Sequence, residues 1–228
     1  VLLLAALDMQ EHRDAAAVLL FLWIWGVVLF TTYFNWTTNA RTVYPLLPAA
    51  AIVAVRRLGE RKELAAPAAT ARLLAPFAAA ACLALAVAWA DLTLANVQRT
   101  AASLLQQRLK DYPRTVWFQG HWGFQYYMES FGFRALDYRT SRVHDGDIVI
   151  IPQNNNRIWR LPGDTFQHLG TLQLTPCRWL TTLQESRGAG FYWDGTGPLP
   201  FVFGVTEPEQ YSLYLSGPDK KPPAARTE

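Results

Sequence analysis

Long uncharged runs of apolar residues occupy much of the first ninety positions. The segment 15–34, AAAVLLFLWIWGVVLFTTYF, contains twenty residues without a charge, and a helix of that length crosses the roughly 30 Å hydrocarbon core of a bilayer. The segment 73–90, LLAPFAAAACLALAVAWA, contains a further eighteen. The segment 42–55 has fourteen, which alone would also fit a re-entrant or buried helix. Because spans flank it on both sides, it is expected to cross too, and the pattern predicts about three transmembrane helices.

The first seven residues, VLLLAAL, form a shorter apolar run that leads directly into the polar sequence DMQEHRD. A signal peptide would need a basic region before its apolar core, and this run has none. We interpret the run as the end of a fourth helix. The sequence is therefore expected to be the C-terminal part of a longer polytopic protein.

Beyond Ala90 the pattern becomes amphipathic and then changes to short elements. Apolar residues recur at helical spacing as far as Leu105, so the third span is predicted to continue as a helix to about Lys110, before Pro113. A strand, a helix and a buried strand are predicted to follow, at 114–120, 121–133 and 146–153. That order predicts a βαβ unit with parallel strands.

The remaining sequence predicts strands, turns and a tail. FQHLGTLQLT, at 166–175, reads as a strand, and the glycine-, proline- and aromatic-rich segment 185–204 predicts turns joined by short strands. The polar, proline-rich residues 217–228 are expected to be disordered. The predicted fold is a membrane α-helical region, residues 1–90, followed by a small extracytoplasmic α/β domain, residues 91–216.

Charge separates these two regions and predicts their orientation. Residues 1–90 hold seven Lys/Arg and five Asp/Glu, whereas residues 91–228 hold fourteen and thirteen, so the second region is nearly neutral and has no charge pattern for nucleic acid. The loop RRLGERKE, at 56–63, is strongly basic, and the loop before it offers only Arg41. The positive-inside rule then places 56–63 in the cytoplasm and everything after Ala90 outside.

The sequence GHWGFQYY is the first candidate site. It follows a predicted strand and opens a predicted helix, where backbone N–H groups can hold an anion, but its two glycines match neither the Rossmann nor the P-loop pattern. One interpretation is that it contacts a sugar or phosphate through His121, Trp122, Gln125 and Tyr126. The other is a tight turn with a packed aromatic helix, which the spacing of the aromatic residues favours.

Metal and nucleophile motifs are weaker. HDGD, residues 144–147, could offer metal ligands, but a turn before a buried strand explains it better, since no further carboxylate or histidine lies at a ligand spacing. No metal site and no cofactor are predicted, although a divalent ion is left open without support. No Ser-His-Asp order, CxxC or HExxH motif occurs.

The stretch NARTVYPLLPAA, residues 39–50, is the second candidate site. Arg41 lies at the predicted outer end of a span, where its guanidinium can reach a lipid phosphate or a pyrophosphate leaving group. Pro45 falls in the first turn of the following helix, and Pro48 predicts a bend. The alternative is that Arg41 extends to ordinary lipid head groups. The residues of this stretch favour the two interpretations of Arg41 equally.

ARTVYPLLPAAAIVA resembles the RYxLPxLP-like helix of the GT-C superfamily of integral-membrane glycosyltransferases, of the polyprenyl-phosphate-sugar mannosyl- and aminoarabinosyltransferase type. Thr42 and Val43 stand where that pattern prefers an aromatic residue, and Tyr44 follows one or two positions late. The segments VWFQGHWGFQYYMESFG, GDIVIIP and GFYWDGTGPLPFVFG are similar to the C-terminal extracytoplasmic region of bacterial members.

The resemblance implies transfer of a sugar from a polyprenyl-phosphate donor to an envelope acceptor at the outer face of the bacterial inner membrane. Arg41 and Tyr44 would contact the donor phosphate, and the catalytic acid is expected upstream, in an early external loop. The implied partners are the polyprenyl-phosphate-linked sugar and membrane lipids. The competing interpretations are a membrane-anchored module that binds a glycan or a protein without catalysis, and a structural accessory subunit in which Arg41 is merely interfacial.

Overall fold

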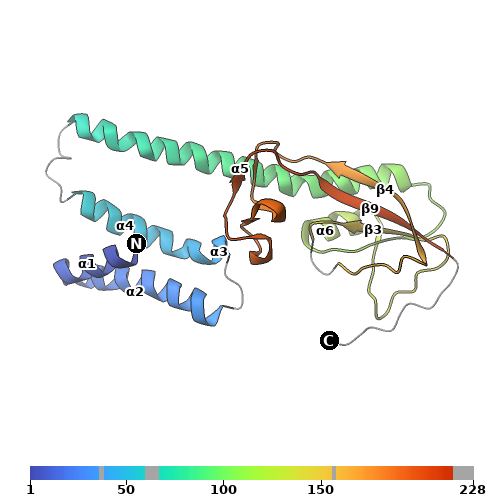
Figure 1. Cartoon of the computed structure of the whole chain (residues 1–228), viewed down its shortest axis with the longest axis horizontal. Coiled ribbons are helices and arrows are strands. Elements are labelled where there is room, and N and C mark those ends of the chain that lie inside the picture. The colour runs from blue at the N-terminus through green and yellow to red at the C-terminus, as the bar shows by residue number, and fades with distance from the viewer. Residues whose placement is uncertain (36–38, 60–66, 156–157, 218–228) are drawn as a thin grey trace. The chain divides into compact units, whose positions relative to one another are not determined.

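The computed structural model describes residues 1–35, 39–59, 67–155 and 158–217 (Figure 1). Its contacts divide the chain into two compact units. The first, called here the helical unit, comprises Val1–Asp91 and Trp179–Val205, and the second, the sheet unit, comprises Leu92–Arg178 and Thr206–Glu228. Sequence analysis assigned residues 91–216 to one domain, whereas this division groups 179–205 with the helices.

The helical unit is built from apolar helices with short breaks. Its elements are α1 (Leu2–His12), α2 (Ala15–Leu29) with a π-helical end (Phe30–Phe34), α3 (Ala40–Val43), a 3₁₀ turn (Tyr44–Leu46), α4 (Leu47–Gly59) and the first half of α5 (Pro67–Leu109). Asp14 caps α2 by accepting a 2.6 Å hydrogen bond from the Ala17 N–H. Small and branched side chains let α1, α2 and α4 pack closely around Ala5, Leu20, Ile24, Ala49 and Val53.

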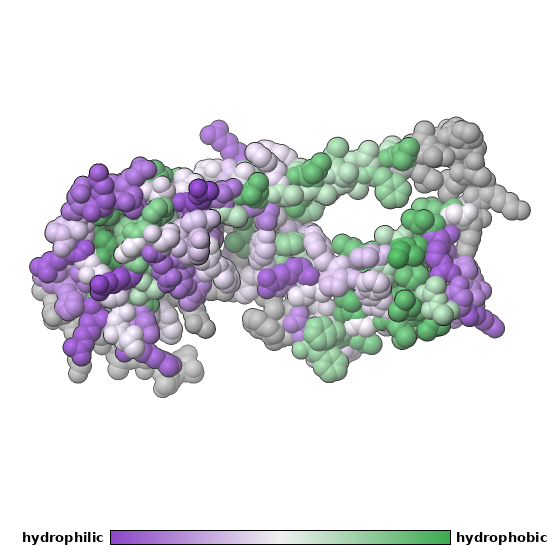
Figure 2. Space-filling model, turned by 180° about the vertical axis from the view of Figure 1, so that it is seen from behind, coloured by the Kyte–Doolittle hydropathy of each residue, from purple (hydrophilic) through white to green (hydrophobic). Residues whose placement is uncertain are grey.

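Two helices of the described chain are long and apolar enough to cross a membrane, by length and composition. They cover Ala15–Phe34 and Leu74–Leu109, and only 22% and 6% of their most apolar stretches is buried. Figure 2 shows apolar residues gathered over these helices and polar residues over the sheet unit. The predicted third span, 42–55, lies across the 3₁₀ turn and the thirteen-residue α4, so a count of three spans is not confirmed.

The breaks in α3–α4 follow the prolines only in part. Pro45 lies within the 3₁₀ turn, where its missing N–H removes a helical donor, and α4 begins two residues later. Pro48 lies in the first turn of α4, so the departure from α-helix comes before Pro48, where sequence analysis placed a bend. The predicted continuation of the third apolar helix is confirmed, since α5 ends at Leu109.

The sheet unit contains a five-stranded mixed sheet in the order β2-β1-β3-β9-β4. Its strands are β1 (Val116–Phe118), β2 (Arg134–Ala135), β3 (Ile148–Pro152), β4 (Phe166–Leu174) and β9 (Glu209–Ser216). The predicted parallel pairing of β1 with β3 is confirmed, and α6 (Trp122–Ser130) follows β1 as expected. Two strands were missed: β2, which pairs with β1 in parallel, and β9, which lies antiparallel between β3 and β4.

One core holds the sheet unit together. The second half of α5 packs against the sheet and α6 through its buried residues Ala101 and Leu105. Phe118 of β1 meets Phe124 of α6 edge to face at 5.9 Å, and Phe124 meets Tyr211 of β9 at 5.1 Å. Strand β9, which was not predicted, therefore contributes to the core of the sheet unit.

The segment 179–205 consists of turns and short strands, which were predicted for residues 185–204 but not for 179–184. It contains β5 (Leu180–Thr181) paired with β8 (Val202–Phe203), and β6 (Leu183–Gln184) paired with β7 (Ala189–Gly190). Of the predicted disordered tail, Gly217 donates to the Thr165 carbonyl at 2.7 Å, and 218–228 lie outside the described residues.

Candidate functional site

Polar and aromatic side chains of the helical unit gather where α3 begins. We call Asn39, Arg41, Tyr44, Asp91 and Tyr192 the arginine cluster. The buried Asn39 accepts a hydrogen bond from the Thr42 N–H at 3.2 Å and so caps α3. Its amide also donates to the Tyr192 carbonyl at 3.4 Å. The cap therefore joins the start of α3 to the segment 179–205.

Aromatic contacts reinforce this junction. Tyr44 lies edge-on to Phe191, with 5.2 Å between ring centroids, and Phe191 lies edge-on to Tyr192 at 4.9 Å. Trp23 of α2 donates to the Pro45 carbonyl at 2.8 Å, and the Thr31 hydroxyl donates to the Thr42 carbonyl at 3.3 Å. These bonds hold α2 beside the turn that carries Arg41 and Tyr44.

Asp91 is held by two hydroxyl donors. The Tyr192 hydroxyl donates to one carboxylate oxygen at 2.5 Å, and the Thr182 hydroxyl donates to the other at 2.8 Å. Burial is the largest cause that raises the pKa of Tyr192, followed by its hydrogen bond to Asp91 and the charge of Asp91, while Arg41 acts in the opposite direction. Tyr192 therefore stays a neutral donor at physiological pH.

Arg41 is the charged member that faces outward. Its side chain is exposed, and it forms no hydrogen bond or ion pair with another described residue. Its positive charge acts to lower the pKa of Tyr192, against the larger effect of burial. An exposed guanidinium can bind two oxygens of an anionic group in a bidentate manner.

Sequence analysis selected Arg41 and Tyr44 but missed the rest of the arginine cluster. Asp91 is the first charge after a long apolar run, which was a usable signal. Tyr192 had none, because it is separated from Asp91 by 101 positions.

A second group lies at the carboxyl ends of the parallel strands β1 and β3, an edge where α/β sheets commonly bind ligands. We call Gln119, His121, Tyr138, Asn155 and Trp159 the strand-end cluster. The buried Gln119 side chain accepts from the Trp159 N–H at 2.7 Å and donates to the Trp159 carbonyl at 3.2 Å and to the Tyr138 hydroxyl. Burial raises the pKa of Tyr138, so this hydroxyl is neutral.

The backbone after β1 makes a tight turn against β3. At Gly120 φ is +99°, and an added Cβ would lie 2.9 Å from the Pro152 side chain, so glycine is required. Asn155 accepts from the His121 N–H at 2.8 Å and donates to the His121 carbonyl at 3.3 Å. These bonds fix the entry into α6.

The predicted contact residues on α6 divide into two pairs. The His121 ring lies 2.9 Å from the Gln125 side-chain oxygen, and the Gln125 amide donates to Glu129 at 2.8 Å. Trp122 and Tyr126 are 63% and 69% exposed, so they do not belong to the packed face of α6. That face is made by Phe124 and Met128, whose exposed fraction is zero.

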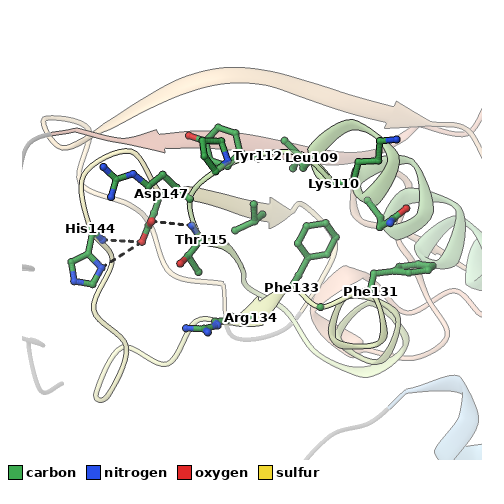
Figure 3. Close-up of a pocket in the computed structure, with 14 residues that line it drawn as sticks. Leu109, Lys110, Tyr112, Thr115, Phe131, Phe133, Arg134, His144 and Asp147 are labelled. Carbon is green, nitrogen blue, oxygen red and sulfur yellow. Dashed lines mark hydrogen bonds and ion pairs between the residues drawn. The ribbon is translucent and has the colours of Figure 1, made fainter.

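The HDGD segment forms the turn that its sequence predicts. Asp147 is buried and accepts from the N–H groups of His144 at 2.9 Å and Thr115 at 3.2 Å (Figure 3). It also accepts from the ring N–H of Trp117 at 2.9 Å. Gly146 takes φ +81° in this turn. Among the described residues, no group of three or more His, Cys, Asp and Glu side chains is placed to hold a metal.

A buried ion network at the other end of the helical unit was also missed. Asp8 of α1 is fully buried, lies 3.4 Å from Arg56 of α4 and from the His12 ring, and forms no hydrogen bond through its carboxylate with any described residue. Arg56 also pairs with Asp14 at 3.4 Å. The spacing of Asp8 and His12, four positions apart beside an apolar helix, was the signal that could have found it.

Searches against protein-family models, curated proteins and solved structures gave no match for this chain.

Proposed function

We propose that this chain is part of a membrane glycosyltransferase that transfers a sugar from a polyprenyl-phosphate donor to a cell-envelope acceptor, and that Arg41 holds the donor phosphate. The observation that carries the proposal is the arginine cluster, in which the exposed Arg41 lies on α3, between the Asn39 cap and Tyr44, and both Asn39 and Tyr44 contact the segment that carries Tyr192.

The surroundings of the helices support a membrane setting. The apolar stretch of α5 is almost entirely exposed in the chain, and transfer of such a surface out of water is strongly favourable. Tyr33, Tyr44 and Trp89 are 75%, 46% and 61% exposed and lie near the ends of the apolar segments, where amphipathic rings favour the lipid interface. Arg41 would then lie at the depth of phosphate groups.

The charge distribution supports the assignment of Arg41 to the outer face. Arg56 and Arg57 end α4, at the opposite end of the α3–α4 segment from Arg41. By the positive-inside rule, this end of α4 faces the cytoplasm, and the arginine cluster faces the other side. A donor linked to a polyprenyl chain would present its phosphate at that depth, with its chain between the helices and the lipid.

The chemistry of Arg41 suits a phosphate leaving group. A guanidinium forms paired, charge-assisted hydrogen bonds to two phosphate oxygens and stays ionised throughout. The Tyr44 hydroxyl can donate a hydrogen bond to the same group. The Tyr192 hydroxyl already donates to Asp91, so Tyr192 positions that carboxylate rather than the phosphate. The cluster also contains the carboxylate of Asp91, whose two oxygens accept hydrogen bonds from the Thr182 and Tyr192 hydroxyls. We therefore assign Asp91 a role in positioning the segment that carries Tyr192.

The test measures donor binding without turnover. Full-length chain in detergent micelles is titrated with farnesyl phosphate and, separately, with farnesol. Arg41→Ala should weaken binding of farnesyl phosphate by about tenfold or more, as expected for loss of a charge-assisted contact, and Arg41→Lys should lie between, while farnesol binding stays unchanged.

Arg13→Ala is the matched control, because Arg13 is an exposed arginine at the end of α1 whose guanidinium contacts only the Gln10 carbonyl among described residues. Unchanged farnesyl phosphate binding by Arg41→Ala would overturn the proposal. It would favour instead an anchored glycan-binding module, for which the exposed Trp122 and Tyr126 offer the contact surface.

A further inference from the structure

A cavity lies in the sheet unit, and its lining shares no residue with either cluster described above. It has a volume of ≈ 640 Å³ and opens between the end of α5, the turn after α6 and the loop before β3 (Figure 3). A volume of this size accommodates a small ligand such as a monosaccharide derivative. We call it the cationic pocket, after the side chains described next.

Basic side chains surround this pocket. Its Lys/Arg residues are Lys110, Arg114 and Arg134, and His144 lies at the same rim, against one carboxylate, Asp147. That carboxylate is already occupied by three internal N–H donors, of Thr115, Trp117 and His144. The lining therefore carries more basic than acidic groups, and the ring that lies against the carboxylate is that of His144, 3.8 Å from Asp147.

The two guanidinium groups are not committed elsewhere. Neither the Arg114 nor the Arg134 guanidinium forms a hydrogen bond or ion pair with another described residue. Lys110 lies 3.9 Å from Asp111, but both side chains are exposed, and such surface pairs contribute little. All three cations are thus available to an incoming anion.

The frame of the pocket is rigid on the side that carries Arg114. The Tyr112 hydroxyl donates to the Gly146 carbonyl at 2.6 Å and so ties the end of α5 to the turn before β3. The Arg114 side chain lies over that turn, since a Cβ added at Gly146 would come within 3.7 Å of it. Arg114 is therefore positioned by the turn that Asp147 stabilises.

Aromatic rings supply the other kind of surface. Phe131, which is 41% exposed, and the half-buried Phe133 line the pocket on either side of Gly132. Figure 3 shows Phe133 between Lys110 on one side and Arg134 on the other. An added Cβ at Gly132 would meet no atom within 4 Å, so the space beside these rings is open.

We propose that the cationic pocket binds a phosphorylated saccharide, with the phosphate held by Arg114 and Arg134 and the sugar ring placed against Phe133, the aromatic ring nearer to Arg134 in Figure 3. Guanidinium groups bind phosphate oxygens in pairs, and a ligand site combines a few such polar contacts with aromatic walls. The inference goes beyond the proposed transferase, since it requires neither turnover nor Arg41.

Isothermal titration of the full-length chain in detergent micelles tests this assignment with glucosamine 1-phosphate, glucosamine and inorganic phosphate as probes. Glucosamine 1-phosphate should bind most tightly, and raised salt should weaken its binding. The double variant Arg114→Ala/Arg134→Ala should weaken it by about tenfold or more, from the loss of charge-assisted contacts. Phe133→Leu should weaken binding of glucosamine 1-phosphate but leave binding of inorganic phosphate unchanged.

Two controls make the outcome decisive. Arg99→Ala removes an exposed arginine of α5 outside the pocket lining and should bind as the wild type does. Arg41→Ala should also leave binding of glucosamine 1-phosphate unchanged, so this proposal and the donor-phosphate proposal fail independently. Equal affinity for inorganic phosphate and glucosamine 1-phosphate, or wild-type affinity in a folded double variant, would overturn the assignment.

Discussion

Tyr192 shows how one side chain can link a loop to the helices. Its hydroxyl donates to Asp91 and its carbonyl accepts from Asn39, so it touches residues from two separate helical segments. Sequence analysis identified Arg41 and Tyr44 from a local pattern of charge, aromatic residue and proline. Asp91 and Tyr192 were not predicted as site residues, because a hydrogen bond between distant positions produces no periodic pattern in the sequence.

The raised pKa of Tyr192 predicts a loss of stability at high pH. The folded state favours the protonated phenol, so its contribution to stability is fully present below pH of about 10, the unfolded value, and is lost as pH rises above it. The midpoint of thermal unfolding of the full-length chain should therefore fall between about pH 8 and pH 11, a range that spans the unfolded pKa. Tyr192→Phe should flatten that fall.

Tyr192→Phe should have only a small effect on the free energy of unfolding at neutral pH. Tyr192→Phe removes one hydrogen bond to a carboxylate at a partly exposed site, which costs about 1 kcal/mol. Tyr126→Phe is the control, because Tyr126 is largely exposed. A Tyr192→Phe chain with the wild-type pH profile would show that this hydroxyl does not support the arginine cluster.

Among the helices, the contact of α1 with α4 depends on charge as well as on packing. The shared core of Ala5, Ala49 and Val53 is small, and the buried Asp8 faces Arg56 from the neighbouring helix. A buried carboxylate is tolerated only when a partner compensates for the loss of water. Arg56 thus has a structural role in addition to its part in the predicted topology.

Asp8→Asn should destabilise the helical unit by about 2 kcal/mol, since it leaves the Arg56 guanidinium with only the exposed Asp14 as a carboxylate partner. Replacing both residues, as Asp8→Leu/Arg56→Leu, should recover most of that loss, because no buried charge remains. Denaturant titration in micelles, followed by circular dichroism, measures both.

Glu11→Gln supplies the comparison with an exposed pair. Glu11 lies 2.6 Å from Arg57, but its side chain is 53% exposed, so its loss should cost less than about 1 kcal/mol. If Asp8→Asn is no more costly than Glu11→Gln, the buried pair does not hold α1 to α4.

Elements with long local patterns were predicted well. The apolar spacing of α5 predicted its end within one residue, and β4 matches its predicted segment. The two-residue β2 is too short to carry a pattern and forms because β1 offers an open edge. In β9 the alternation of Tyr211, Leu213 and Leu215 with polar residues was present, but its partners β3 and β4 lie far away in the sequence.

For the molecule as a whole, the proposal places the end of α4 in the cytoplasm and the sheet unit outside. Cysteine accessibility tests this in a chain whose own Cys82 and Cys177 are replaced by alanine. Arg142→Cys, on an exposed loop of the sheet unit, should react with a membrane-impermeant maleimide in intact bacterial spheroplasts. Gly59→Cys should react only after permeabilisation, and its side chain has open space around it.

The reverse labelling pattern would invert the topology and remove Arg41 from the outer face. Labelling of both positions in intact spheroplasts would contradict a membrane-spanning arrangement. In either case the cationic pocket would still be testable, because its evidence lies wholly within the sheet unit.

Local sequence was sufficient for the apolar helices, the extent of α5 and the parallel pairing of β1 with β3, because hydrophobic burial and helix geometry repeat over a few residues. Folding in three dimensions was needed for the arginine cluster, the buried Asp8 and the cationic pocket. Each of these joins residues from different elements, as when the segment 179–205 brings Tyr192 to Asn39 and Asp91. The energies of such contacts depend on burial and on distances that no single stretch of sequence contains.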